Sequence, residues 1–170
     1  MFLNYIKNFL TKKAVKKELV NFKLSYEDSK IKTVGVVIDA IDTNILNDIL
    51  LDLIQKGIEK QAISVLIYKT NAKEEMEYPS FCFKDLSWSG TINKVEVNEF
   101  VNQKFDLLIN YYDTEKAPLL LVSYRSKASF KVGFSSVDKR LNHFMISTET
   151  KDYLVFLNEL FKYLKILKKI

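Results

Sequence analysis

Short apolar runs alternate with helical patterns along most of the chain. The run from 33 to 39 (TVGVVID) is apolar at successive positions, and β-prone runs follow at 62–68, 105–111 and 130–134. Continuous apolar strands are expected where helices cover both faces of a parallel sheet. The pattern predicts an α/β fold in which parallel strands are joined by helices.

The connections between these runs fit the same prediction. After the first run, Thr43 is a plausible N-cap, apolar residues follow at helical spacing, and Gly57 supplies a C-terminal stop. After the run at 105–111, Asp113 or Thr114 can cap a second helix. Two parallel neighbouring strands require a connection of this kind.

We therefore predict a single three-layer domain, Rossmann-like or flavodoxin-like, with a mostly parallel sheet of four or five strands. The sequence does not separate these two strand orders. It also predicts short strands near Phe81 and at 144–147, a polar linker at 25–32, and a final helix from about 150 to 167. The expected organisation is an amphipathic basic helix in 1–23, followed by the α/β domain in 24–170.

Composition places the chain among soluble globular proteins, because 48% of its residues are apolar and 28% are charged. Cys82 and His143 are the only residues of their types, which excludes a Cys/His metal site and an internal disulfide. No apolar run has the roughly twenty residues of a membrane span, and the first residues lack the pattern of a signal peptide. We expect a cytoplasmic protein that needs no metal or cofactor.

The net charge of +5 belongs to the two ends of the chain, since residues 1–23 carry six lysines and one glutamate. In this first segment, one predicted face holds Phe2, Ile6, Phe9, Leu10, Val15 and Leu19. Two interpretations stay open. The helix lies on an anionic membrane or a nucleic acid backbone, or it packs its apolar stripe on the domain and leaves its lysines in water.

If both terminal helices shared one surface, their lysines would form a positive patch that attracts anionic lipid. The predicted patch consists of Lys7, Lys12, Lys13, Lys16, Lys162, Lys165, Lys168 and Lys169. Nucleic acid is a less favoured partner, because Arg125 and Arg140 are the only arginines and binding modules interleave arginine with aromatic residues.

Open α/β sheets bind ligands outside the carboxyl ends of their strands. The four glycines exclude a P-loop and a glycine-rich dinucleotide turn. The strand-end loops still offer a candidate site for an anionic ligand, formed by Asp39, Asp42, Asp113, Lys116 and Arg125. Its carboxylates suit magnesium binding or acid–base chemistry. The alternative is that Asp42 and Asp113 have no ligand and are present because aspartate caps helix ends and interacts favourably with the helix dipole.

No residue is predicted to be catalytic. No serine lies in the Gly-x-Ser-x-Gly turn of hydrolases, and His143 precedes an apolar run that indicates a structural role. Cys82 lies between Phe81 and Phe83, which indicates a buried thiol. These two phenylalanines and Trp88 are candidates for a contact surface, with burial in the core as the alternative.

Four segments carry a resemblance to a known family: Lys84–Gly90 (KDLSWSG), Phe105–Lys116, Ser126–Phe134 and Arg140–Asn142. Together they resemble a small uncharacterised bacterial family, a domain of unknown function, along the whole chain. This resemblance implies a fold and no mechanism. Phe105–Phe134 alone is similar to part of the N-terminal half of heptosyltransferase-like glycosyltransferases, but the chain lacks their second Rossmann half and their small-residue turn after the first strand.

Three functional hypotheses follow. The first is a non-catalytic α/β domain that acts through a protein or surface contact. The second is a small enzyme-like domain that binds a nucleotide or sugar nucleotide at the strand-end loops. The third is peripheral binding to an anionic membrane through the basic terminal helices.

Overall fold

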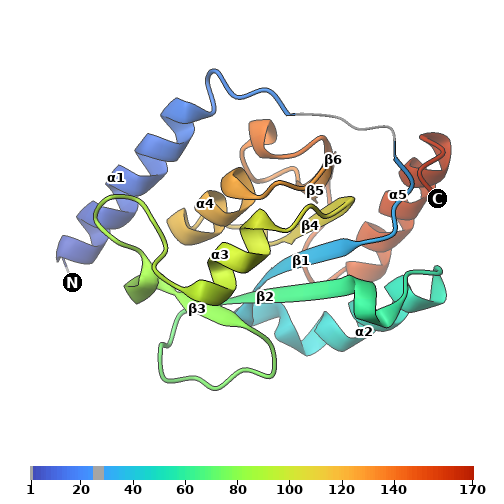
Figure 1. Cartoon of the computed structure of the whole chain (residues 1–170), viewed down its shortest axis with the longest axis horizontal. Coiled ribbons are helices and arrows are strands. Elements are labelled where there is room, and N and C mark those ends of the chain that lie inside the picture. Colours follow the sequence, from blue (N-terminus) through green and yellow to red (C-terminus); the bar gives the residue numbers. More distant parts are fainter. Residues whose placement is uncertain (1, 25–28) are drawn as a thin grey trace.

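A parallel sheet runs through the middle of the molecule, with helices on both of its faces (Figure 1). The computed structural model describes residues 2–24 and 29–170; residue 1 and residues 25–28, which belong to the predicted linker, lie outside the described residues. In spatial order the strands are β3 (Ser80–Cys82), β2 (Ile63–Lys69), β1 (Val34–Asp39), β4 (Leu107–Tyr111), β5 (Phe130–Phe134) and β6 (Phe144–Ile146).

The strand order is that of a doubly wound Rossmann sheet. This confirms the predicted α/β class and settles the choice between the two strand orders. All the neighbouring strands pair in parallel. In the described ranges the sheet has six strands, more than the predicted four or five, because β3 and β6 have only three residues each and give weak apolar patterns.

The helices form the two outer layers. One face of the sheet is covered by α2 (Leu46–Gln55) and α5 (Tyr153–Ile166), and the other by α1 (Phe2–Glu18), α3 (Val95–Asn102) and α4 (Ala117–Arg125). The apolar core is accordingly divided into two clusters, one on each side of the sheet. The two basic terminal helices therefore lie on opposite faces.

The central strand β1 is buried along its whole length, as its apolar pattern predicts. Because Gly35 has no side chain, the ring of Phe105 can pack directly against the backbone of β1. A Cβ atom at this position would lie 2.8 Å from ring carbons of Phe105, so a side chain here would displace the ring from the core.

A chain of buried polar side chains joins α4 to the sheet. Lys131 Nζ donates to the Ser123 carbonyl oxygen at 2.8 Å, the Ser123 hydroxyl donates to Asn110 Oδ1 at 2.8 Å, and Asn110 Nδ2 donates to Asn142 Oδ1 at 2.8 Å. The Ser123 carbonyl belongs to the last turn of α4, so Lys131 satisfies one of the acceptors that a helix end exposes. Burial lowers the pKa of Lys131 to about 8.

This lowered pKa predicts a rise in stability with pH. The unfolded chain keeps the Lys131 proton up to about pH 10.4, whereas the folded chain releases it from about pH 8. Between these values the unfolded state binds more protons, so the free energy of unfolding increases. We expect the increase between pH 8 and pH 10 to be about 2 kcal/mol larger in the wild type than in Lys131→Met, measured by urea denaturation. Equal pH profiles for the two proteins would contradict the assignment.

Candidate functional site

The strand order reverses between β1 and β4, and the carboxyl edge of the sheet at this point is where open α/β folds bind ligands. Asp39 ends β1, and Lys116 immediately precedes α4. Lys116 Nζ lies 2.5 Å from Asp39 Oδ2, and the aspartate side chain is almost completely buried. The two charges that the sequence assigned to a ligand thus neutralise each other.

The other predicted carboxylates lie near this ion pair. Asp42 is in the 3-10 helix η1 (Ala40–Ile45) and is buried. Burial raises the pKa of Asp42, a hydrogen bond with Thr150 opposes this effect, and the neighbouring carboxylates of Asp113 and Asp39 raise the pKa further. Asp42 Oδ2 has no hydrogen-bond partner among the described residues. The pKa of Asp42 therefore lies above the ordinary value of an aspartate.

The magnesium interpretation of these carboxylates has no geometric support. In the part of the chain that the structure describes, no three His, Cys, Asp or Glu side chains are arranged to hold a metal ion. The placement of Arg125 in the site was also wrong. Arg125 is the last residue of α4, and Lys116 precedes the first, so the helix separates them.

Helix α1 lies over the same edge and is anchored there by polar contacts. Asn8 Oδ1 accepts a hydrogen bond from the Ala117 backbone N–H, at the first residue of α4, at 3.2 Å. Lys16 Nζ forms an ion pair with Glu115 at 2.6 Å, and Arg140 donates to the Lys16 carbonyl oxygen at 3.3 Å. A helix N-terminus that can hold an anion is here capped by the chain's own Asn8.

Lys7 is the deepest of these anchors. Its Nζ donates to the Leu86 carbonyl oxygen at 2.7 Å and lies 4.6 Å from the centroid of the Phe83 ring and 5.9 Å from that of Trp88. The buried residues of α1 are Lys7, Thr11 and Val15. This inward face is largely polar and is not the apolar stripe that the sequence predicted.

Most apolar residues of the first half of α1 point to solvent instead, and Ile6 is half-buried. We call this surface the outer face of α1. It contains Phe2, Leu3, Tyr5, Phe9 and Leu10, whose exposed fractions run from 50% for Leu10 to 74% for Phe2, and continues into the exposed Lys13 and Lys17. Of the two interpretations left open, packing of the stripe on the domain is therefore wrong for Phe2, Phe9 and Leu10, whereas Val15 and Leu19 are in the core.

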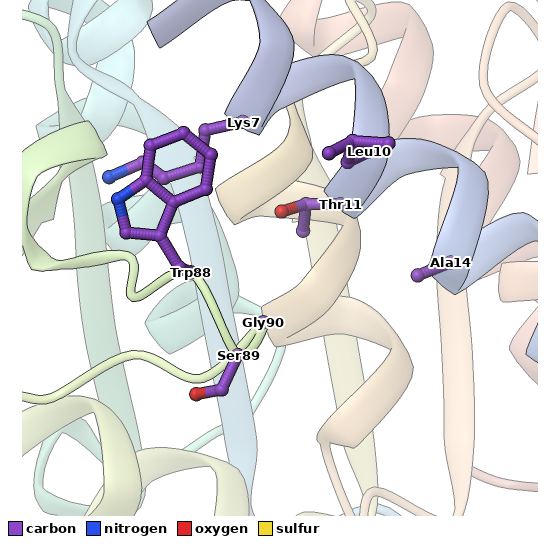
Figure 2. A pocket seen from close by; sticks show the side chains of 7 residues that line it. All are labelled: Lys7, Leu10, Thr11, Ala14, Trp88, Ser89 and Gly90. Carbon is purple, nitrogen blue, oxygen red and sulfur yellow. The ribbon is translucent and has the colours of Figure 1, made fainter. Parts of the chain in front are cut away.

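A pocket of about 180 Å³ lies beside this surface, between α1 and the turn at 87–90 (Figure 2). The Trp88 ring lies over Lys7 on one side, and Leu10, Thr11 and Ala14 extend along α1 on the other. Ser89 and Gly90 complete the lining. Because Ser89, Gly90 and Ala14 are small residues, the pocket has room for an apolar group of another molecule.

The three aromatic contact candidates have different environments. Trp88 is 63% exposed, whereas Phe81 is completely buried and packs edge-on against Tyr68. Phe83 is half-buried and faces the Lys7 amine. Trp88 thus lies on the surface, where a contact residue must be. Phe81 belongs to the core, which was the alternative to a contact role for these residues.

The predicted lysine patch is not assembled. Lys7 and Lys169 are buried, and Lys16 is paired with Glu115. Lys162, Lys165 and Lys168 belong to α5 or follow it, on the opposite face of the sheet from Lys12 and Lys13. On α1 itself, Lys13 and Lys17 are exposed.

Sequence reasoning did not find the anchors Asn8, Glu115 and Arg140. Each contacts a residue about a hundred or more positions away in the chain, and no local pattern marks such pairs.

His143 has a structural role, since its Nδ1 accepts a hydrogen bond from the Lys131 backbone N–H at 2.9 Å. Among the described helices, none is long and apolar enough to cross a membrane.

Comparison with known proteins gives one match. The model of a family described as "Family of unknown function (DUF6913)" matches residues 7–167. No curated protein and no solved structure matches the chain. The similarity of Phe105–Phe134 to heptosyltransferase-like enzymes stays a prediction from the sequence.

Trp88 and Phe81 provide a matched pair of aromatic truncations. We expect Phe81→Ala to lower the free energy of unfolding by about 3–5 kcal/mol, because it opens a cavity in the core. Trp88→Ala should change it by no more than about 1 kcal/mol, since most of the ring is already in water. Chemical denaturation measures both values. A Trp88→Ala loss as large as that of Phe81→Ala would place Trp88 in the core.

The Asp39–Lys116 ion pair can be tested as a structural element. We expect Lys116→Met to lower the free energy of unfolding by about 2 kcal/mol, because it leaves a buried carboxylate without its partner. In an Asp39→Asn background the same substitution should cost less than about 1 kcal/mol. Chemical denaturation of the four proteins gives the coupling. If Lys116→Met stabilised the fold, the pair would instead be a site that sacrifices stability for ligand binding.

Proposed function

The chain belongs to the family of unknown function DUF6913, which assigns it no reaction, and we propose from its geometry that it is a non-catalytic domain that binds anionic membranes peripherally. The binding surface consists of the outer face of α1 and the neighbouring Trp88. The observation that supports this proposal is the orientation of α1, which turns its polar anchors inward and its aromatic residues outward.

The apolar part of this surface suits the boundary between lipid headgroups and acyl chains. Phe2, Phe9 and Leu10 are exposed on one helix, and Trp88 stands next to Leu10 across the pocket. Helices that lie in the membrane interface bury aromatic and leucine side chains in this way. Contiguous exposed apolar surface of this kind marks an interaction site in a soluble protein.

The charged part of the surface selects an anionic partner. Lys13 and Lys17 are exposed on the outward side of α1 and have no ion pair among the described residues. A lysine that reaches an anionic lipid surface contributes about 1 kcal/mol.

The nucleotide-binding alternative receives less support from the geometry. Lys116 is engaged by Asp39, and the N-terminus of α4 is capped by Asn8. A phosphate at this edge would meet a lysine whose charge is already balanced by Asp39. Arg125, the other cation of the predicted ligand site, lies at the far end of α4.

Trp88 allows a direct test, because it is the only tryptophan in the chain. Titration with vesicles of anionic phospholipid should shift its fluorescence to shorter wavelength as the ring leaves water, and sedimentation should retain the protein with the vesicles. Vesicles of zwitterionic phospholipid should give little of either effect. Binding should weaken as salt rises, since exposed charges are screened beyond about 8 Å at physiological ionic strength.

Two surface variants separate the apolar and charged contributions. Phe9→Ser should weaken binding about tenfold, through the loss of one partly inserted aromatic side chain. Lys13→Glu/Lys17→Glu should weaken it by at least that factor. The controls are Leu51→Ser on α2, an exposed apolar residue on the other face, and Lys60→Glu. Equal binding to both kinds of vesicle, or equal loss in the controls, would refute the proposal.

A further inference from the structure

One edge of the sheet is only partly covered. Strand β3 pairs with β2 at Ile67, Tyr68 and Lys69, and the half of β2 that precedes Ile67 has no neighbour on this side in the described part of the chain. Pro79, the residue before β3, has no N–H group and cannot extend the ladder. The first half of β2 is therefore an open strand edge.

The backbone at this edge offers unpaired groups. The Ile67 N–H donates to the Pro79 carbonyl oxygen at 2.9 Å, which shows that Ile67 points toward the β3 side. Backbone groups of alternate residues point to the same side of a strand, so the N–H and C=O of Val65 also face outward. Among the described residues none bonds to these two groups of Val65.

A groove of about 320 Å³ lies along this edge. Its floor is Ile63, Ser64 and Val65. One side is formed by α3, and the other by the segment before β3, with the lining residues Tyr78, Pro79, Glu96, Glu99, Phe100 and Gln103. The edge is thus flanked on both sides; Ile63 and Ser64 are half-buried, and Val65 between the two flanks is 6% exposed. An added strand would enter between the flanks to reach the Val65 backbone.

The charge of the groove defines its occupant. Glu96 and Glu99 are exposed on α3, and neither belongs to an ion pair in the described residues. Tyr78 and Phe100 provide the apolar contacts. Because successive side chains of a strand point to opposite faces, a strand in the groove would place alternate residues against α3 and against Tyr78. A second copy of the same edge would oppose glutamate to glutamate, so the partner is a different chain.

We propose that this groove binds an extended peptide segment of a partner protein, with alternating basic and apolar residues, as an added strand beside β2. The backbone of Val65 supplies main-chain hydrogen bonds, and the α3 glutamates select basic side chains. This site is separate from the outer face of α1 and does not depend on membrane binding.

The test uses the peptide acetyl-Lys-Val-Lys-Val-Lys-amide and the full chain labelled with ¹⁵N. The Val65 amide signal should shift in a saturable manner at millimolar peptide, and its hydrogen exchange should slow. The same peptide N-methylated at all five residues should not do this, because none of these residues can then donate a main-chain hydrogen bond in either strand orientation. No Val65 shift, or equal shifts with the N-methylated peptide, would overturn the proposal.

A pair of charge variants tests the selection of basic residues. Glu96→Lys/Glu99→Lys should weaken binding of the basic peptide about tenfold. The control Asp48→Lys/Asp52→Lys changes the net charge by the same amount on α2, which lies on the other face of the sheet, and should leave binding nearly unchanged. Equal weakening in both variants would show a general charge effect and would overturn the assignment to the groove.

Discussion

The ion pair between Asp39 and Lys116 organises the carboxyl edge of the sheet. A nearly buried carboxylate at the end of β1 carries a large desolvation cost unless a cation is held against it. Lys116 provides that cation and fixes the start of α4 against β1. The next residue, Ala117, then presents its N–H to Asn8, so the position of α1 depends on the same contact.

This arrangement explains why α1 is oriented against its own apolar pattern. The surface beneath it includes a helix N-terminus, the Leu86 carbonyl and the Glu115 carboxylate, beside the apolar residues that Val15 and Leu19 contact. Such groups require hydrogen-bonding or charged partners when they are covered. The polar side chains of α1 satisfy them, and the aromatic residues remain outside because the inward positions are already taken.

The sequence was informative where structure is determined by neighbouring residues. The apolar runs located β1, β2, β4 and β5 and predicted burial on both faces, because a strand covered on both sides is apolar at successive positions. The sequence offered β3 and β6 as short strand candidates. Because each has only three residues, the predicted sheet did not count both, and its four or five strands fell short of the six that the described residues form.

The site was predicted less well, since it depends on contacts that no local pattern records. Asp39 and Lys116 were selected correctly as neighbours at the strand ends, but as ligand-binding groups rather than as partners of each other. The face of α1 was misassigned because apolar periodicity predicts burial only when the surface below is apolar too. Lys7 illustrates the limit: its amine is satisfied by a carbonyl 79 positions away.

The net charge of +5 conceals two surfaces of opposite sign. The outer face of α1 presents lysines, whereas the groove beside β2 presents the glutamates of α3. An anionic membrane would attract the first surface and repel the second. The groove lies beside β2 at the edge of the sheet and shares no residue with the outer face of α1. The two proposed contacts therefore do not compete for the same side chains, although neither requires the other.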